Sequence, residues 1–305
     1  MAFGLLAVIA TGVSWIISGI IMGKLPKVGI DTDAHLVIGS ALNGIVGVAI
    51  GLFVGFSAGV PIRTIVLGLG ILFVAGIVNN RQLVWMSKAM QVGPNGIIWS
   101  FLQCGFIIPF IFLSVCYHSE VTPFKVGGCI VLIAAMLIMG VTGKNNKEST
   151  GPWLMLTFLA FLVTGVSQTM TNIPSFFEGA ERLDSSWKMA ANGFGLAAGS
   201  LFFGLFEKPS PHVIRKTIAS LNQKLFWWYI FIHHAPTILI NFLLFYYGMD
   251  TLAKHGVGAI AFPLMTGSCI IAFDIYSMAV LHERRTPLQL FALLLCLLGI
   301  VGFCF

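Results

Sequence analysis

Apolar residues in this chain gather into ten long stretches, which short polar or Gly/Pro-containing segments separate. Each stretch is near the ~20 residues that an α-helix needs to cross a bilayer. Long runs of alternating apolar and polar residues, as in membrane strands, are absent. The pattern predicts an all-α integral membrane protein with ten transmembrane helices, at residues 2–23, 36–59, 64–90, 94–117, 123–143, 153–175, 187–206, 225–248, 256–281 and 287–305.

Composition supports the same class. Of the 305 residues, 57% are hydrophobic and 9% are charged, against roughly 25% charged residues in a typical soluble domain. The net charge of +6 comes mostly from Lys and Arg at the ends of the stretches, which indicates topology rather than nucleic-acid binding. The six cysteines form no CxxC motif and are interpreted as packing residues. The first stretch follows no basic segment, so we interpret it as a retained helix.

The basic residues predict which side of the membrane each loop occupies. Eleven lie in or beside odd-numbered loops and five in or beside even-numbered loops. Because Lys and Arg are more frequent in cytoplasmic loops, we expect a multi-pass protein of the cell (inner) membrane with odd loops in the cytoplasm and both termini outside. The eleven are Lys24, Lys27, Lys88, Lys144, Lys147, Lys208, Arg215, Lys216, Lys224, Arg284 and Arg285, and the five are Arg63, Lys125, Arg182, Lys188 and Lys254.

A short motif occurs twice, 164 residues apart. "HSEVTPFKVGG" (118–128) and "HERRTPLQLFA" (282–292) share a His followed by Thr-Pro, and each precedes the last helix of a predicted set of five. This placement predicts two five-helix repeats, at 1–143 and 153–305, joined by a linker loop at 144–152. Because each half has an odd number of helices, the repeats are inverted, an architecture of secondary transporters whose site lies near the midplane.

The segment "LHERRTPLQLFALLLCLLGIVGF" is similar to the closing segment of the drug/metabolite transporter superfamily. The resemblance rests on a Glu, a Thr-containing turn and a final Gly-Ile: Glu283, Thr286, Gly299 and Ile300, with Glu120, Thr122, Gly127 and Gly140 in the first half. Residues 75–105 and 165–179 look most like the L-rhamnose–proton symporter (sugar permease) branch, on Gly76, Asn79, Gly93, Gly165 and Asn172. The resemblance implies proton- or cation-driven uptake of a small sugar-like metabolite.

Four consecutive polar residues, Asn79 to Gln82, interrupt the third stretch. A loop beginning at Asn79 would leave about fifteen residues before it, which is short for a crossing. As part of one helix over 64–90, Arg81 lies about 6 Å from its centre. A cation at that depth costs roughly 2.5–3.5 kcal/mol and usually faces a partner or a wet cavity. We interpret Arg81, Asn79 and Asn80 as substrate-binding residues, with snorkelling of Arg81 to the interface as the alternative.

Titratable groups on two other stretches are predicted at the same depth. Asp274 is the only carboxylate well inside an apolar stretch and is the candidate partner of Arg81. His233 and His234 lie in the cytoplasmic half of the eighth stretch. We expect Asp274 or a histidine to take up a coupling proton, with a purely structural ion pair as the alternative. Adjacent helical residues diverge by about 100°, so only one histidine is expected to face a cavity, with His234 preferred.

Aromatic and amide side chains complete the predicted substrate site. Trp85 lies four residues after Arg81, and Gln103 lies four residues after Trp99, so each pair shares a helix face. Taken singly, each Trp is more typical of helix packing or the interfacial aromatic belt than of substrate contact. The further candidates are Trp15, Gln168, Asn172 and Asn241. No metal is expected, because one imidazole and a distant carboxylate are not a ligand set.

The function predicted from these observations is secondary active transport. No Walker-type phosphate loop is present. An intramembrane enzyme would need a paired catalytic motif, and a scaffold would not need costly charges on three helices, so both rank below a carrier. No enzyme activity and no cofactor are predicted. We expect proton-coupled (or Na⁺-coupled) uptake of a sugar- or polyol-like metabolite by a monomer or homodimer, and export of amino acids or other small metabolites is the alternative.

Overall fold

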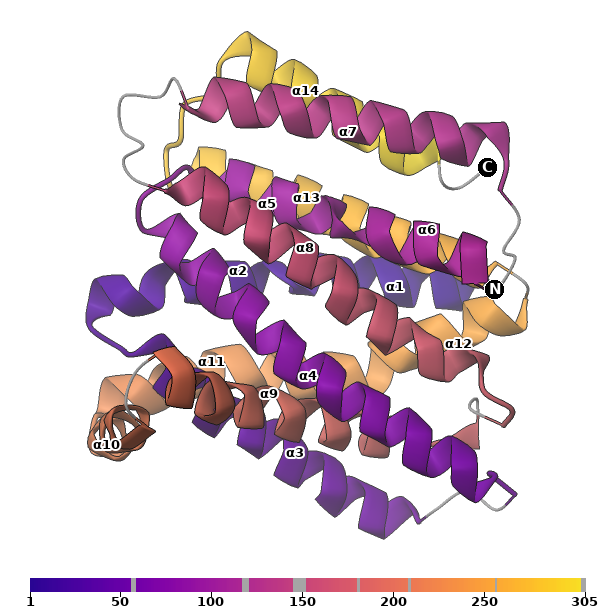
Figure 1. Cartoon of the computed structure of the whole chain (residues 1–305), viewed down its shortest axis with the longest axis vertical. Coiled ribbons are helices and arrows are strands. Elements are labelled where there is room, and N and C mark those ends of the chain that lie inside the picture. Colours follow the sequence, from indigo (N-terminus) through magenta and orange to yellow (C-terminus); the bar gives the residue numbers. More distant parts are fainter. Residues whose placement is uncertain are drawn as a thin grey trace.

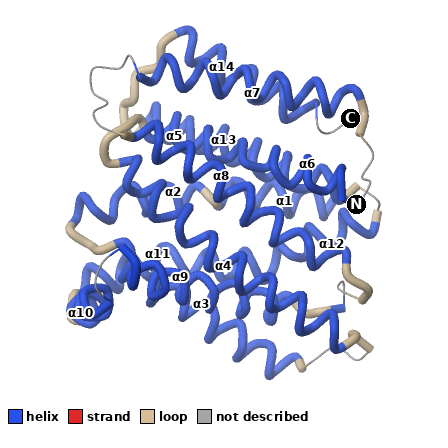
Figure 2. Tube along the Cα trace, in the orientation of Figure 1, coloured by secondary structure: helices blue, strands red, loops and turns tan. Residues whose placement is uncertain are grey.

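A computed structural model describes residues 1–55, 59–116, 121–144, 152–179, 182–207, 210–255 and 257–302. Over this part of the chain the regular structure is helical and contains no strand (Figure 2). Seven of the described helices, counted with their continuations, are long and apolar enough to cross a membrane: Ala2–Val28, Thr32–Val54, Ile62–Met90, Asn95–Cys116, Trp153–Phe176, Lys224–Leu252 and Ala261–Ala279. The structure therefore fits a multi-pass membrane protein, and the full count of ten crossings stays a prediction.

The helices of the first half coincide with the first five predicted stretches to within a few residues. A 3₁₀ turn at Leu25–Val28 extends the first rod, and another at Cys104–Phe106 joins the two helices of the fourth. Asp31 caps the second rod by accepting a hydrogen bond from the Ala34 amide at 3.1 Å. The helices are α1 (Ala2–Ser14), α2 (Ile16–Lys24), α3 (Thr32–Val54), α4 (Ile62–Met90), α5 (Asn95–Gln103), α6 (Ile107–Cys116) and α7 (Pro123–Lys144).

The helices of the second half follow the other five stretches, with one addition. A 3₁₀ turn at Ile173–Phe176 follows α8, a π-helical turn at Asn241–Phe245 joins α11 to α12, and a 3₁₀ turn at Gly258–Ile260 precedes α13. The helices are α8 (Trp153–Asn172), α9 (Ser185–Glu207), α10 (Ser210–Leu221), α11 (Lys224–Ile240), α12 (Tyr246–Lys254), α13 (Ala261–Ala279) and α14 (Pro287–Gly302).

Helix α10 lies in a segment that the apolar pattern left as a loop. Val213, Thr217 and Ser220 are buried at i, i+4 and i+7, whereas Ile214 and Ile218 are exposed. The helix is too short and too polar to be predicted as a transmembrane helix, but one of its faces packs on α3 and α9. It lies at the opposite side of the molecule from the N-terminus (Figure 1). We call these two sides the α10 side and the N-terminal side.

The helices pack with α7 and α14 side by side along one edge and α3 toward the opposite edge (Figure 1). Small residues bring some of them very close together. A Cβ atom added at Gly195 of α9 would collide with the backbone carbonyl of Phe73 on α4, and one at Gly199 would lie 2.9 Å from the Ile77 carbonyl oxygen. Gly195 and Gly199 therefore allow α9 to pack closely against α4.

Both copies of the repeated Thr-Pro motif cap a helix in the same way. The Thr122 hydroxyl accepts a hydrogen bond from the Lys125 amide at 3.3 Å, and the Thr286 hydroxyl accepts one from the Gln289 amide at 3.2 Å. Each Pro that follows is the first residue of its helix, where a missing N–H costs nothing. Residues 118–120 of the first copy, and residues 145–151 of the predicted linker, lie outside the described residues.

Candidate binding cavity

A cavity of about 210 Å³ lies between helices of both halves. It receives side chains from the α1–α2 rod, α3, α4, α5, α8, α9, the α11–α12 rod and α13. Drug-sized ligands usually occupy roughly 300–1,000 Å³. The volume therefore fits a smaller ligand.

The cavity wall is polar and aromatic but carries no formal charge, because no Asp, Glu, Lys or Arg is among the described residues that line it. Aromatic side chains supply flat apolar surface, and hydroxyls lie between them. The amides are Asn43, Asn79, Gln82, Gln103, Gln168, Asn192 and Asn241, and the aromatic residues are Trp15, Trp99, Phe245, Tyr246 and Phe262. Amides with adjacent aromatic faces are suited to a neutral molecule with many hydroxyl groups.

Two amide oxygens in this wall have unused hydrogen-bonding capacity. Gln103 Oε1 and Gln168 Oε1 are buried and accept no hydrogen bond from the part of the chain that the structure describes. Leaving a buried polar atom unsatisfied costs about 1–3 kcal/mol. Such atoms beside a cavity are satisfied by water or by a ligand, so they mark where a donor group of a ligand would bind.

The helices that line the cavity are irregular at the level of the lining residues. The first rod is interrupted at Trp15, between α1 and α2. The rod made of α11 and α12 contains Pro236 inside α11, and the π-helical turn that joins the two helices begins at Asn241. Proline removes one backbone hydrogen bond, and π-helical turns are frequent at functional sites. Both rods are therefore irregular where they meet the cavity, and Trp15 and Asn241 line it there.

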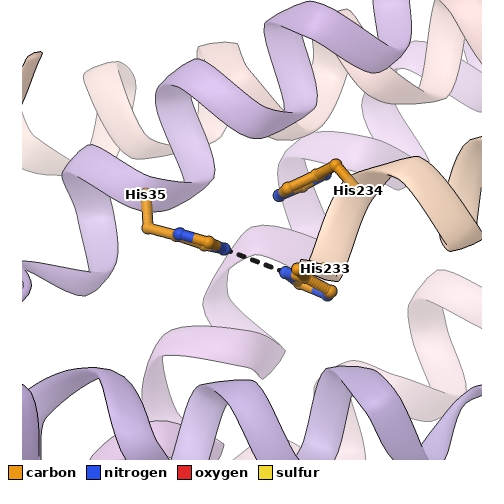
Figure 3. A group of neighbouring side chains, drawn as sticks. All are labelled: His35, His233 and His234. Atoms are coloured by element: carbon orange, nitrogen blue, oxygen red, sulfur yellow. Dashed lines mark hydrogen bonds between the residues drawn. The ribbon is translucent and has the colours of Figure 1, made fainter. Parts of the chain in front are cut away.

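Three histidines lie close together beside the cavity, and two of them, His233 and His234, line it. Figure 3 shows their side chains. His35 Nε2 and His233 Nδ1 are 2.9 Å apart, and His233 Nε2 is 2.9 Å from the Ser18 hydroxyl. His234 Nδ1 is 3.2 Å from Asn43 Oδ1. All three rings are buried. We call His35, His233 and His234 the histidine cluster.

The histidine cluster corrects one expectation and the ground of another. Both His233 and His234 line the cavity, because a 100° offset still leaves two residues on one broad face of a helix. The ground for expecting no metal, a single imidazole, is wrong, because His35 lies beside the other two histidines and was overlooked. That residue lies one position before the predicted second stretch, and so was treated as part of a loop.

Arg81 has a different partner from the one predicted. Its Nη2 lies 3.2 Å from Asp33 Oδ1, and its Nε and Nη2 donate to Asn80 Oδ1 at 3.1 and 2.7 Å. The guanidinium also lies over the Phe203 ring, 4.4 Å from its centre. The expected pairing with Asp274 is wrong. Asp33 was overlooked because it lies in the first turn of α3, which the apolar pattern assigned to a loop.

Asp274 takes part in a separate cluster near the N-terminus of α5. Its carboxylate lies 2.9 Å from Arg285 Nη2 and accepts a hydrogen bond from Ser100 at 3.0 Å. Glu283 lies 3.3 Å from Arg285 and accepts hydrogen bonds from the amides of Asn95 and Gly96. A carboxylate at a helix N-terminus is favourable. Asp274 does not line the main cavity, and its role in proton coupling stays a prediction.

Helix geometry explains which other predicted residues reach the cavity. Asn79 does, whereas Arg81, two positions later, lies about 200° away around α4. Trp85 shares the face of Arg81 and is likewise absent from the cavity wall. Asn80 instead bonds to Ser200 Oγ at 2.6 Å, and Asn172 donates to the Gln168 carbonyl at 3.0 Å. The predicted residues that line the cavity are Trp15, Asn79, Trp99, Gln103, Gln168, His233, His234 and Asn241.

Comparison with known proteins gives a fold and nothing more specific. No family model matches this chain, and no curated protein matches it. Twenty chains of solved structures do match. One of them, described only as "Crystal structure of protein", has a TM-score of 0.61 over 98% of this chain and 97% of its own length, at 15% sequence identity. That likeness shows that the two chains share a fold.

Proposed function

We propose that this chain is a secondary transporter of a small, uncharged, polar metabolite of the sugar or polyol type, coupled to protons. The observation that carries the proposal is the uncharged cavity, with its amides, aromatic faces and two unsatisfied amide oxygens, between helices of both halves. Exporters of amino acids are the alternative. A zwitterion needs charged partners, which the described cavity wall lacks, so a neutral solute is favoured.

The packing of the helices supports two inverted five-helix repeats. We number the helical rods one to ten, with α1–α2 as rod one, α5–α6 as rod four, α11–α12 as rod eight and α10 left out. Rods three and six pack together, as do their counterparts eight and one. Rod three also packs on rod seven, and the counterpart rods eight and two pack on each other. Rod one packs on rod nine, and the counterpart rods six and four pack on each other. Rods two and seven, and rods five and ten, pack with their own counterparts.

Two ion pairs, each of a buried cation and a partly buried carboxylate, lie on either side of the cavity, where a transporter would have its gates. Arg81–Asp33 lies on the α10 side, where neighbouring Asp31 pairs with Lys216 of α10. Lys188–Asp250 joins α9 to α12 on the N-terminal side, where a Cβ atom added at Gly4 of α1 would lie 2.9 Å from Thr251 Cγ2. Alternating access requires one such closure to open while the other stays closed. The excess of basic residues in odd loops supports placing the α10 side in the cytoplasm.

The histidine cluster supplies candidates for the coupling proton. His233 touches Ser18 of the first rod and His35 of α3, so its protonation would change contacts between three rods. Histidine is the side chain whose ordinary pKa lies closest to neutral pH. His233→Gln is therefore expected to abolish accumulation driven by an imposed pH gradient, while exchange of solute across the membrane without a gradient continues.

A thermal-shift screen of the purified chain against sugars, polyols, amino acids and nucleosides tests the proposal. We expect a neutral polyhydroxylated compound to raise the unfolding temperature. That compound is then tested for uptake into proteoliposomes with and without an imposed pH gradient. Gln168→Ala should reduce the ligand-induced shift at a fixed ligand concentration, and the exposed Gln223→Ala serves as matched control. Stabilisation by amino acids alone would support the alternative, and stabilisation unchanged in Gln168→Ala would contradict the site.

A further inference from the structure

The histidine cluster has the chemistry of a metal site as well as that of a proton acceptor. Each of the three rings has a nitrogen atom within 4.8 Å of a nitrogen atom of both others. Two of the rings come from consecutive residues of α11 and the third from the first turn of α3 (Figure 3). We propose that His35, His233 and His234 bind a divalent transition-metal ion of the Zn²⁺, Ni²⁺ or Cu²⁺ class.

The hydrogen bonds of the rings indicate which nitrogen atoms would bind the metal. Ser18 contacts His233 Nε2, which leaves Nδ1 as the ligand atom, and Asn43 contacts His234 Nδ1, which leaves Nε2. His234 Nε2 is buried without a hydrogen bond among the described residues. On His35 the ligand atom is Nε2, the one that faces His233. A metal-bound histidine almost always has its other nitrogen atom held by a hydrogen bond, and Ser18 and Asn43 provide this for two of the three.

Metal binding requires one proton to move. A proton now lies between His35 Nε2 and His233 Nδ1, which are 2.9 Å apart. Both atoms must offer a lone pair to the metal. When His233 Nδ1 carries this proton, it moves to Nε2 of the same ring, which then donates to the Ser18 hydroxyl, and the ring stays neutral. When His35 Nε2 carries it, it moves to Nδ1 of His35, which is buried without a hydrogen bond among the described residues. The metal and a coupling proton thus compete for the same nitrogen atoms.

Only small movements separate the present geometry from a metal site. With Zn–N bonds of about 2.0–2.1 Å, ligand atoms in a tetrahedral site lie about 3.3 Å apart. The pair at 2.9 Å must open slightly, and the third ring must approach to close gaps that are now at most 4.8 Å. Gly39, one turn after His35, makes room for this ring, because a Cβ atom there would collide with the imidazole of His234.

The ligand set predicts which metals bind. Three neutral imidazoles suit Zn²⁺, Ni²⁺ and Cu²⁺, whereas Mg²⁺ and Ca²⁺ require oxygen ligands. No carboxylate lines the described cavity to provide those oxygens. Three protein ligands leave a fourth position for water or another small ligand on the cavity side. Because His35 is on α3 and the other two are on α11, an occupied site would also tie these two helices together.

The test measures metal binding to the full-length chain, purified with a tag that contains no histidine. Co²⁺ titration should give the visible absorption of a tetrahedral site with one ion per chain, displaced by Zn²⁺ and unaffected by Ca²⁺. His35→Ala and His234→Ala should abolish it. His255→Ala, which changes an exposed histidine outside the cluster, should leave it intact. Binding that persists in both cluster variants, or no stoichiometric binding by the unchanged chain, would overturn the proposal.

Two further variants keep all three histidines. Asn43→Ala removes the contact to His234 Nδ1 and should weaken binding by about 10- to 100-fold. Gly39→Ala should displace the His234 ring and lower affinity at least as much. Thermal unfolding without metal shows whether each variant is folded, and a folded Gly39→Ala with unchanged affinity would contradict the assigned geometry. Because binding is measured without transport, failure here leaves the proposed function untouched.

Discussion

Two ion pairs, each of a buried cation and a partly buried carboxylate, join helices on opposite sides of the cavity. The helix that carries the acid in one pair corresponds to the helix that carries the base in the other. On the α10 side, Arg81 of α4 lies 3.2 Å from Asp33 of α3. On the N-terminal side, Asp250 of α12 lies 3.4 Å from Lys188 of α9. Within the proposed repeat, α3 corresponds to α9, and α4 to the rod that contains α12. The two pairs therefore occupy equivalent places in the two halves.

The pairs differ in how firmly the cation is bound. The planar Arg81 guanidinium bonds to Asn80 and Asp33 and lies 4.4 Å from the centre of the Phe203 ring. The Lys188 ammonium lies at a longer distance from Asp250 and 5.8 Å from the centre of the Tyr246 ring. An ammonium is a flexible point charge without the fixed fork of a guanidinium. We therefore expect the N-terminal side to open more readily than the α10 side.

Arg81→Met is expected to lower the free energy of unfolding more than any other variant of these ion pairs. It takes the guanidinium away from Asp33, in a pair whose side chains are 5% and 15% exposed. Removing one partner of a buried pair costs about 3–5 kcal/mol, and we expect a loss near the lower end because Asp33 retains some contact with solvent. Chemical unfolding in detergent measures it.

The double variant Arg81→Met/Asp33→Leu separates the pair from general disruption of the helix. Replacing both charges by apolar groups is often neutral, so much of the lost stability should return. A double variant at least as unstable as Arg81→Met alone would show that the ion pair is not the source of the loss.

Lys188→Met has a smaller expected effect on stability and a larger one on access. A hydrogen bond to a charged group contributes about 1.5–3 kcal/mol, and Asp250 is more exposed than Asp33, at 23% against 15%. Loosening this side should speed labelling of Thr171→Cys, in the cavity, by a thiol reagent that cannot cross the membrane. Labelling rates equal in the presence and absence of Lys188→Met would contradict a gate at this place.

The apolar pattern located the helices well because burial in lipid demands long apolar runs. It could not locate helix α10 or the first turn of α3, because both segments are polar and polar segments were assigned to loops. Asp33 and His35 lie in that turn, and they are the partners of Arg81 and His233. The site was therefore predicted in part: the sequence identifies which polar side chains are deep, but pairing depends on rotation about each helix axis. A two-residue step along α4 is enough to place Asn79 in the cavity and Arg81 outside it.

Substitutions of the neutral amides of the cavity should lower ligand affinity and affect stability little, whereas substitutions in the ion pairs should lower stability. Gln103→Ala and Gln168→Ala remove buried oxygens that have no hydrogen bond among the described residues, so no hydrogen bond of these oxygens is lost and stability should fall less than in Arg81→Met. Each should lose one hydrogen bond to a bound ligand, about 0.5–1.5 kcal/mol or roughly 2- to 12-fold in affinity. Isothermal titration with the stabilising compound measures this. A large loss of stability with unchanged affinity would make these residues structural.

Lys216→Met should have the smallest effect, although its ion pair with Asp31 is, at 2.7 Å, shorter than Arg81–Asp33 and Lys188–Asp250. Its side chain is 40% exposed, and water and salt screen such pairs to about 0–1 kcal/mol. Burial, and not distance, should therefore rank Arg81, Lys188 and Lys216. Unfolding measured at low and high salt checks this ranking, because only the Lys216 contribution should fall markedly as salt rises. A Lys216→Met loss equal to that of Arg81→Met would show that α10 is an integral part of the closure on its side.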